Sequence, residues 1–428
     1  MNNFKQNQKI AQVKNCTLVV GIDIGSTKHF ARAFDWRGTE LGKVCIFSNS
    51  REGFNALSAW MQRISAKHNK SDVIVGIEPT GHYWFNLDAY LEDEGILLVM
   101  VNPYAVKQSK ELDDNSPSKN DYKDPKVIAK LVIDGRYSKP YIPEGVYAEL
   151  RIRVSNRMRV NKELGAIRNR LARWFSIYFP EYCNVFGDYE AIGSMLVLNV
   201  ACTPQKILEL GPEGVNNIWR AAKLRAVGMK RATTLCETAK ASIGQRTSAV
   251  GAEYEMKILL QDYAYKKAQY DAILEEITRL CNEIPESKQM LAIKGIGILT
   301  VSGFLAEAGD LRRFESPRQI QKLAGLSLRE NSSGKHKGQT TISKRGRSRL
   351  RAILFNAAIP MVAHNAEFSA LHNYYTTRAN NALKKKQSII AICCKLIRVF
   401  YAIFTKHVAY DGQKLLSDIH RNFEPQIA

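Results

Sequence analysis

Two apolar runs near the start of the chain constrain its fold more than any other feature. Residues 17–23 (TLVVGID) and 72–78 (DVIVGIE) each have the length and composition of a buried β-strand, and each ends on an acidic residue. If the two strands lie side by side and parallel, their terminal carboxylates, Asp23 and Glu78, project at the same sheet edge, where α/β proteins generally form their sites. The sequence therefore predicts an acidic site in an N-terminal α/β domain.

The segments around these runs have the pattern of an α/β layer. Alternating or continuous apolar residues predict strands, and one-sided apolar spacing predicts helices. The further expected strands span 28–34, 43–48 and 96–101, and the expected helices span 51–67 and about 82–94. Three strands followed by alternating helix and strand is the order of an RNase H-like mixed sheet, which we assign to residues 1–143.

A second pair of acids, Asp121 and Asp124, follows in the segment KNDYKD. The run after them looks helical, so their spacing of three residues places both on one face of its first turn. Mg²⁺ accepts carboxylate oxygens, and two such ions can clamp the oxygens of a phosphoryl transfer. Four acids thus predict a Mg²⁺ site, although each alone could be a helix cap or turn residue. Asp113 and Asp114 are interpreted as solvated loop acids.

The charge of the chain indicates its partners. Lys and Arg number 62 against 41 Asp and Glu, a net charge of +21, which favours a nucleic acid as the neutralising polyanion. A membrane is not expected, because no segment approaches the roughly 20 uninterrupted apolar residues of a spanning helix. The first residues lack the apolar core of a signal peptide, and the eight cysteines form no C-x₂-C pair. These features predict a cytoplasmic protein without structural zinc.

Residues 144–288 predict a helical or coiled-coil region. Its first helix, 144–178, carries eight Lys or Arg and one Glu between Arg151 and Arg173, and we interpret this face as a phosphate-binding surface in preference to a merely solvated one. A second helix, 253–282, has heptad spacing that Lys267 alone interrupts, and an antiparallel hairpin or a dimerising coiled coil would bury this heptad face. An insertion at about 181–250 is expected to be a helical subdomain.

Residues 289–428 predict a mainly helical C-terminal domain. The segment KGIG, with Lys294, Gly295 and Gly297, resembles a helix-hairpin-helix element that grips DNA backbone through its N–H groups, and a plain helix–helix turn is the alternative.

Residues 312–351 contain twelve Lys or Arg and two Glu, a net +10. Ser332 and Ser333 are expected at a flexible apex inside this segment. A serine becomes a nucleophile only when a base or metal removes its proton and cations hold the phosphate, and Ser-Ser-Gly is otherwise a linker signal. The nucleic-acid contacts predicted for the whole chain are Arg151, Arg153, Arg157, Arg159, Lys294, Gly295, Gly297, Lys335, Lys337, Lys344, Arg345 and Arg347.

Taken in order, these segments resemble the DEDD-type insertion-sequence transposases, the family that includes the Piv-type DNA invertases and bridge-RNA-guided recombinases. The matching pieces are GIDIGSTK at 21–28, GIEPTGHYW at 76–84, VNP at 101–103, KNDYKD at 119–124, IKGIG at 293–297, RRFESPRQIQKLAGLSLRENSSG at 312–334 and ISKRGRSRLR at 342–351. The family's Pro after GLT is Leu328 here.

The resemblance implies a RuvC-like domain whose acidic tetrad, Asp23, Glu78, Asp121 and Asp124, binds Mg²⁺. It implies a nucleophilic serine, Ser333, with Ser332 as the fallback. A serine of one protomer would complete the carboxylate site of another in a homodimer or homotetramer. The implied partners are donor and target DNA and a guide RNA encoded by the element, in a prokaryotic, nucleoid-associated setting.

Three other functions remain as alternatives. A Mg²⁺-dependent junction-resolving nuclease would use the acids without the serine. An actin-like ATPase or sugar kinase is suggested by GIDIGST, which looks like the first phosphate loop of that fold, although +21 is an odd charge for it. A non-catalytic scaffold that binds RNA or DNA would use neither the acids nor the serine.

Overall fold

The structure is a computed structural model, and it describes residues 2–114, 122–247, 249–329, 332–333, 336–338 and 340–420. The chain divides into two compact units, Met1–Ile142 and Pro143–Ala428, and each is described by itself.

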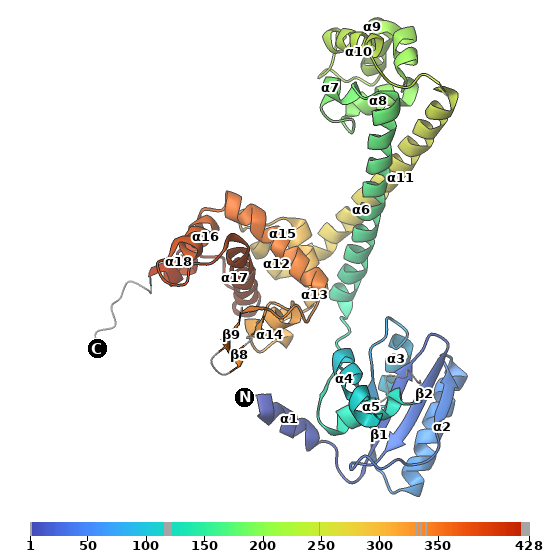
Figure 1. The fold of residues 1–428 in the computed structure, drawn as a ribbon, viewed down its shortest axis with the longest axis vertical. Coiled ribbons are helices and arrows are strands. Elements are labelled where there is room, and N and C mark those ends of the chain that lie inside the picture. Colours follow the sequence, from blue (N-terminus) through green and yellow to red (C-terminus); the bar gives the residue numbers. More distant parts are fainter. Residues whose placement is uncertain are drawn as a thin grey trace. The chain divides into compact units, whose positions relative to one another are not determined.

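Within its described residues, the first unit contains a six-stranded mixed sheet in the order β3-β2-β1-β4-β5-β6 (Figure 1). Strands β1, β4 and β5 run parallel, whereas β2, β3 and β6 join antiparallel. The strands are β1 (Thr17–Ile24), β2 (Lys28–Phe34), β3 (Cys45–Ser48), β4 (Asp72–Ile77), β5 (Leu97–Val101) and β6 (Tyr137–Ser138). The predicted mixed sheet is confirmed, with β6 added, and its assignment to the RNase H-like fold stays a prediction.

Helices cover both faces of this sheet because apolar residues alternate along β1. Leu18, Val20 and Ile22 pack in one buried cluster with α2 and α3, and Val19 packs in another with α5. The helices of this unit are α1 (Asn2–Ile10), α2 (Arg51–Lys67), α3 (Phe85–Asp93), α4 (Pro103–Asp114) and α5 (Asp124–Ile133).

The sequence interpretation missed α4 and was wrong in placing Asp113 and Asp114 in a loop, since the helix continues through Asp114. The start of this helix has an ordinary cap. The Tyr104 N–H donates to the Asn102 side chain at 2.9 Å, and Pro103 occupies the first helical position, where its missing N–H costs nothing.

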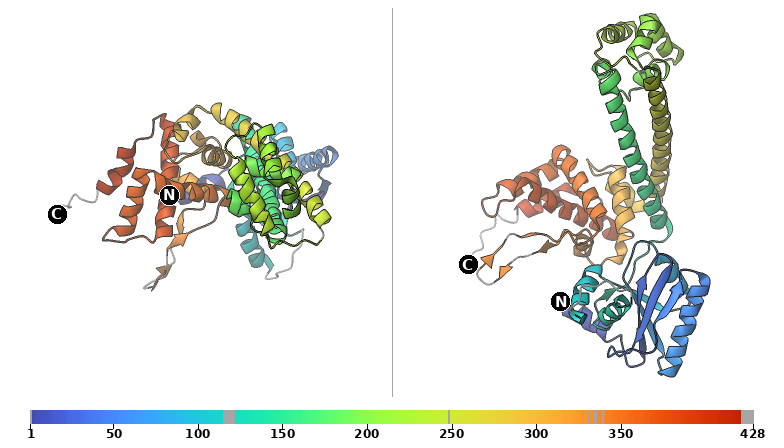
Figure 2. Two further views of the ribbon diagram at one scale, coloured as in Figure 1. Left: turned by 90° about the horizontal axis from the view of Figure 1, so that it is seen from above. Right: turned by 45° about the vertical axis from the view of Figure 1, so that its right-hand side comes forward.

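The second unit contains a long antiparallel helix pair, α6 (Gly145–Tyr178) and α11 (Ala249–Asn282), which Figure 2 shows side by side. The indole of Trp174, near the end of α6, donates to the carbonyl of Ala252, near the start of α11, at 2.9 Å. In the middle of the pair, Lys266 forms an ion pair with Glu163 at 2.6 Å. The sequence left open an antiparallel hairpin or a dimerising coiled coil for α11. The structure has the antiparallel hairpin, formed with α6 of the same chain.

The insertion between these two helices is helical, as expected. A core that includes Trp174, Tyr182 and Trp219 joins its helices to the ends of α6 and α11. Gly211, with φ of 65°, kinks α9 just before Pro212. The helices are α7 (Tyr182–Phe186), α8 (Ile192–Val200), α9 (Pro204–Ala221) and α10 (Met229–Lys240).

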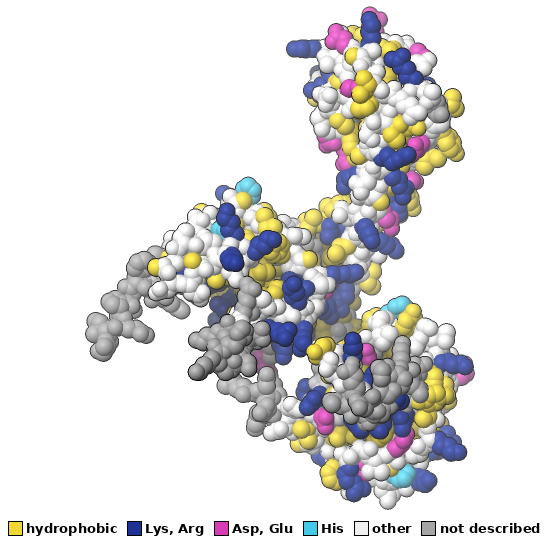
Figure 3. Space-filling model, in the orientation of Figure 1, with side chains coloured by type: hydrophobic (Ala, Val, Ile, Leu, Met, Phe, Trp, Pro, Cys, Tyr) yellow, Lys and Arg dark blue, Asp and Glu magenta, His cyan; other side chains and the backbone are white. Residues whose placement is uncertain are grey.

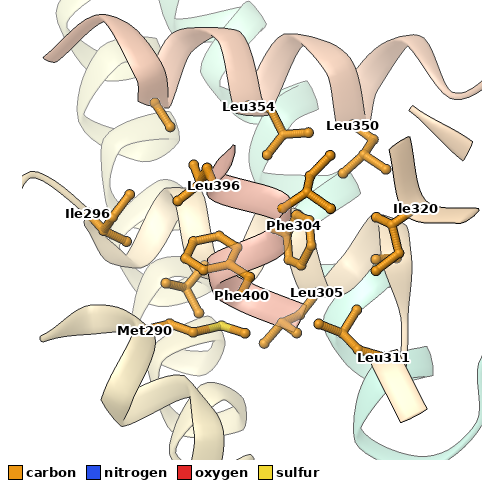
Figure 4. Close-up of a cluster of buried hydrophobic side chains, with 14 of the residues drawn as sticks. Met290, Ile296, Phe304, Leu305, Leu311, Ile320, Leu350, Leu354, Leu396 and Phe400 are labelled. Atoms are coloured by element: carbon orange, nitrogen blue, oxygen red, sulfur yellow. The ribbon is translucent and has the colours of Figure 1, made fainter. Parts of the chain in front are cut away.

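The C-terminal part of the second unit is mainly helical around one buried apolar cluster (Figure 4). Phe304 and Phe400 meet in this cluster with ring centroids 4.9 Å apart, and Leu150 of α6 also packs into it. The helices are α12 (Pro285–Leu291), α13 (Ile298–Ala308), η1 (Leu311–Arg313), α14 (Pro317–Leu323), α15 (Ser348–His364), α16 (Ala366–Thr377), α17 (Lys385–Lys406) and α18 (Gly412–His420).

Helix α17 is the single helix among the described residues that is long and apolar enough, by length and composition, to cross a membrane. Leu396, Phe400 and Phe404 of this helix are fully buried within the apolar cluster. A buried core helix of a soluble protein has the same composition, so this feature is weak support for a membrane span.

Short strand pairs lie between α14 and α15, where a flexible apex was expected. Strand β7 (Leu328–Arg329) pairs with β10 (Thr341–Ile342), and β8 (Ser332–Ser333) pairs with β9 (His336–Lys337), both antiparallel. Backbone groups alone supply the bonds of such a ladder, so a segment too polar for a core can still pair its strands.

Candidate active site

Asp23 and Glu78 occupy neighbouring positions at the ends of two parallel strands. The register pairs Gly21 with Gly76 and Ile22 with Ile77. Asp23 is the next residue of β1, and Glu78 directly follows the last residue of β4. Both acids are half-buried. Side chains alternate between the two faces, and Ile22 and Ile77 point into the cluster under α2 and α3. The two acids therefore belong to the opposite face, which α5 covers.

Two glycines allow α5 to lie directly on this face. A Cβ atom on Gly21 would be 1.9 Å from the carbonyl oxygen of Pro125, and one on Gly76 would be 2.5 Å from a methyl group of Val132. Both distances are shorter than any real contact, so these positions require glycine. Because Gly21 and Gly76 each precede an acid by two residues, the close approach brings the start of α5 to the acidic face.

Asp124 is the first residue of α5 and is buried, with 7% of its side chain exposed. The Nζ atom of Lys110, on α4, lies 2.5 Å from its Oδ2 atom. A carboxylate at a helix N-terminus is stabilised by the helix dipole, and here an ammonium group also neutralises it. Asp121 lies outside the described residues, so its predicted place beside Asp124 stays a prediction. Helix α5 begins at Asp124, which is later than expected for a first turn that carries both acids.

Tyr122 fixes the chain just before α5. Arg32 of β2 donates to the Tyr122 carbonyl at 2.9 Å, and the rings of Phe30 and Tyr122 meet edge to face at 5.3 Å. Arg32 itself donates two hydrogen bonds to the Glu40 carboxylate, each 2.6 Å long. These contacts attach the segment that enters α5 to the sheet.

His29 organises the turn that follows Asp23. It is fully buried, and its Nδ1 atom accepts a hydrogen bond of 3.2 Å from the Gly25 N–H. Burial lowers the pKa of His29, opposed by a hydrogen bond with Asn49, so the ring is neutral at physiological pH. A neutral ring can accept from Gly25, and it thereby fixes the backbone beyond Asp23.

The donor chemistry of this face suits a hard divalent ion. Carboxylates are the side-chain ligands that Mg²⁺ prefers, and Asp124 already holds a cationic group. In the part of the chain that the structure describes, no three His, Cys, Asp or Glu side chains lie together as a metal site. The acids therefore suit such an ion, because they are carboxylates and belong to the same face of the sheet. In this structure the Asp124 carboxylate is paired with the Lys110 ammonium group.

The basic residues predicted to contact nucleic acid divide into two groups. Arg151 donates to the Ala306 carbonyl at 2.9 Å, and Arg347 donates to the Glu307 carbonyl at 2.9 Å. These two guanidinium groups thus satisfy carbonyls at the end of α13, where helices leave them unpaired. Exposed members of the set include Arg159 and Lys344.

The remaining predicted contacts are placed as follows. Arg153 pairs with Glu149 at 3.6 Å on α6, and Arg157 donates to Tyr270 at 3.4 Å. Lys294, Gly295 and Gly297 form the expected turn between α12 and α13, with Gly295 at φ of 93°. Arg345 is exposed, Lys335 lies outside the described residues, and Lys337 lies on β9.

The base of the segment that carries the candidate serines is firmly attached to α14 and α15. Arg351 donates to the Ala324 carbonyl at 2.9 Å, and the Arg347 N–H donates to the Leu323 carbonyl at 2.7 Å. The backbone places Ser333 on β8, opposite His336. This serine belongs to the second unit and the acids to the first.

Sequence reasoning missed Lys110, Gly21 and Gly76 as parts of this site. The glycines were detectable because each stands two residues before an acid, in GID and GIE. Lys110 could have been considered once the Asn102–Pro103 helix start was noticed, since helix α4 carries it toward α5.

Two family models match the chain. Residues 20–180 match the DEDD model of the IS110 type, described as a transposase, and this range contains all four predicted acids. Residues 287–373 match a model described as the transposase IS116/IS110/IS902 family, and this range contains Ser333.

Curated relatives agree with these matches. The pilin gene-inverting protein of Moraxella bovis is 31% identical over 142 residues, which are 32% of this chain and 43% of that protein. The transposase for insertion sequence element IS1111A of Coxiella burnetii is 25% identical over 136 residues, 32% of this chain and 37% of the relative. The chain thus spans less than half the length of these two relatives.

A protein of insertion element IS116 from Streptomyces clavuligerus is similar over a longer range. It is 22% identical over 389 residues, which are 90% of this chain and 94% of the relative. Both family models match in order along the sequence. The chain therefore belongs to the DEDD-type insertion-sequence transposases of the IS110/IS116/IS902 family, a family of DNA recombinases.

Proposed function

We propose that this chain is a transposase that cuts and rejoins DNA strands through Ser333 and the acids Asp23, Glu78, Asp121 and Asp124. The observation that carries the proposal is the shared sheet face. Asp23 and Glu78 take neighbouring register positions on it, and the helix that starts with Asp124 lies against it. Family membership supports the same assignment.

The chemistry is a pair of balanced phosphoryl transfers. The Oγ atom of Ser333 forms a bond to a phosphodiester phosphorus, the bond to one deoxyribose oxygen breaks, and the serine proton is transferred to that oxygen. The free hydroxyl of another strand then attacks the phosphorus of the serine–DNA phosphodiester. The bond from phosphorus to the Oγ atom of Ser333 breaks, and the proton of the attacking hydroxyl is transferred to that Oγ atom. No external energy source is needed, because each broken ester bond is replaced by another.

The first unit's part in this mechanism is to hold carboxylates. Asp23, Glu78, Asp121 and Asp124 would hold Mg²⁺, which when bound would neutralise charge on the transferred phosphoryl group and favour ionisation of the attacking hydroxyl. Strand register fixes Asp23 and Glu78, and the packing of α5 on Gly21 fixes Asp124. His29 holds the turn that follows Asp23, and Arg32 holds the chain just before Asp124.

The serine and the acids come from different units of the chain. We propose that they meet in a homodimer or homotetramer, in which the serine of one protomer completes the carboxylate site of another. Cleavage then depends on assembly, which restricts strand breakage to complexes that are ready to rejoin the strands.

The proposed partners are donor DNA, target DNA and a guide RNA encoded by the element. A net charge of +21 suits a protein that holds several nucleic-acid backbones while base pairing supplies sequence. On the face seen in Figure 3, Lys and Arg side chains gather over the C-terminal helices, with few Asp or Glu among them.

Serine and carboxylate variants test the reaction. With the full chain expressed beside its element, Ser333→Ala and Asp23→Asn should each abolish recombination and retain nucleic-acid binding. Ser333→Ala should also lose the covalent protein–DNA adduct on a denaturing gel, while Ser332→Ala, the matched control, keeps it. The reverse result would assign the nucleophile to Ser332. Cleavage by Ser333→Ala without an adduct would indicate a junction-resolving nuclease.

Guidance by RNA has a separate test. The full chain is purified with the RNA that accompanies it during expression from its own element, and that RNA is sequenced. A discrete RNA from DNA flanking the gene supports guidance, whereas random cellular RNA would reduce the interaction to charge attraction alone.

A further inference from the structure

The ion pair between Lys110 and Asp124 joins two helices of the first unit. Lys110 lies near the end of α4 and Asp124 begins α5, and their charged atoms are 2.5 Å apart. The Asp124 side chain is 7% exposed and that of Lys110 is 30% exposed. The carboxylate is therefore almost removed from water, while its partner retains a route to solvent.

A carboxylate this deeply buried requires a counter-charge, because isolated ions are strongly disfavoured away from water. Lys110 meets this requirement in the structure. The face beside Asp124 is also where the acids Asp23 and Glu78 belong, so a divalent ion there would meet the same requirement.

The two cations compete for one carboxylate. Mg²⁺ binds carboxylate oxygen at about 2.0–2.1 Å, so an ion on Asp124 would lie within a few ångströms of the Lys110 ammonium. Charges of the same sign at such a distance repel, and the burial of Asp124 reduces the screening of this repulsion by water. A bound divalent ion therefore disfavours the present position of Lys110.

We propose that Lys110 is a positioning residue that occupies the cation place on Asp124 until a divalent metal ion displaces it. The inference rests on the proposed carboxylate metal site and adds a residue to it. In the metal-free protein the lysine forms the ion pair with Asp124 and attaches α4 to α5. When the metal binds, the flexible stem of Lys110 moves its ammonium group toward solvent, which its partial exposure permits.

The lysine consequently weakens metal binding and makes it selective. A monovalent ion offers no more charge than the ammonium group it must replace, whereas a divalent ion brings twice the charge. The site is thereby stabilised without metal and still responds to a divalent ion.

Metal affinity tests the inference without relying on recombination. Isothermal titration of the full chain with Mn²⁺ and Mg²⁺ compares the wild type with Lys110→Met, which keeps most of the apolar stem and removes the charge. Lys110→Met should bind metal about tenfold more tightly, the factor that corresponds to 1.4 kcal/mol of lost competition. The matched control is Lys107→Met, which removes an exposed charge one turn earlier on α4 and should bind as the wild type does.

A second variant guards against loss of folding. Lys110→Gln can still donate a hydrogen bond to Asp124 but lacks the charge, and circular dichroism checks that each variant is folded. Its melting temperature should fall without metal and recover on addition of Mn²⁺ by more degrees than that of Lys107→Met. The gain in affinity should vanish when Asp124→Asn is added to Lys110→Met.

The outcomes separate the inference from the function on which it rests. If the wild type, Lys110→Met and Lys110→Gln bind metal equally, Lys110 is an ordinary ion-pair partner. The inference is then overturned while the metal site stands. If no variant, nor the wild type, shows saturable binding, the carboxylate metal site itself fails, and the inference fails with it.

Discussion

Gly21 of β1 lies so close to Pro125 of α5 that a Cβ atom there would be 1.9 Å from the Pro125 carbonyl oxygen. Helix α5 thus lies directly on the backbone of the strand that carries Asp23. The absence of a side chain at Gly21 allows the start of α5, and with it Asp124, to lie against the strand that carries Asp23.

Gly21→Ala should displace α5 and with it Asp124. Overpacking of this kind costs about 1–3 kcal/mol of unfolding free energy, and we expect the upper end because rigid backbone lies in the way. Urea unfolding measures the loss of unfolding free energy. Recombination activity should fall by more than the decrease in folded protein accounts for. Gly165→Ala on α6, where the same methyl meets open space, is the control and should be neutral or stabilise by up to about 1 kcal/mol. Unchanged stability of Gly21→Ala would show that the contact between strand and helix is loose.

Much of the first unit could be predicted because its elements have strong local signals. The strand and helix at 28–34 and 51–67 have the predicted bounds, and β1, β4 and β5 differ from prediction by a residue at one end. Helix α4 was missed because its last residues are polar and acidic, which resembles a loop. The helix is stabilised by its Asn102 cap and by the burial of Val106, which sequence periodicity shows weakly.

The candidate site could be predicted only as a set of acids. Strand ends indicate where carboxylates gather, but the ion pair of Lys110 with Asp124 depends on how two helices pack, and no local pattern encodes it. Similarly, a cluster of positive charges in the sequence does not show which arginines form hydrogen bonds within the protein. Arg151 and Arg347 were grouped with phosphate contacts, and the structure has both bonded to the end of α13.

Arg347→Met should therefore destabilise the protein. The guanidinium group donates to the Glu307 carbonyl at 2.9 Å and contacts its carboxylate at 3.3 Å, and charged hydrogen bonds contribute about 1.5–3 kcal/mol each. We expect a loss in this range by urea unfolding. Arg349→Met, at an exposed position two residues on, is the control and should change stability little. If Arg347→Met keeps full stability and instead weakens DNA binding, the residue is a phosphate contact after all.

Lys344→Met should weaken nucleic-acid binding with little effect on folding. Lys344 is exposed, and its left-handed backbone, with φ of 54°, is no more strained by methionine than by lysine. Loss of one phosphate contact lowers the slope of log affinity against log salt by about 0.9. Filter binding of duplex DNA between low and moderate salt measures this slope. Lys240→Met, exposed at the end of α10, should leave the slope unchanged, and equal slopes in all three proteins would contradict a phosphate contact at Lys344.

Glu190 should make the stability of the helical insertion depend on pH. The hydrogen bond from Arg168 lowers the pKa of Glu190, and a 2.8 Å hydrogen bond from Tyr263 adds to the effect while burial opposes it. A group whose folded pKa is depressed stabilises the protein above its ordinary pKa, here 4.5, and this contribution is lost as the pH falls through the folded pKa.

Glu190→Gln tests this contribution because it removes the charge and keeps the shape. We expect a loss of about 1–2 kcal/mol at pH 7, since Arg168 and Tyr263 both donate to a partly exposed carboxylate. Urea midpoints measured from pH 7 to 3 should show this difference shrinking below about pH 4.5. Glu255→Gln, which breaks the exposed 3.4 Å pair with Arg173 on the same helix pair, should cost less than about 1 kcal/mol. A difference between Glu190→Gln and wild type that stays constant down to pH 3 would mean that the charge of Glu190 does not stabilise the insertion, and that its hydrogen bonds act as neutral ones.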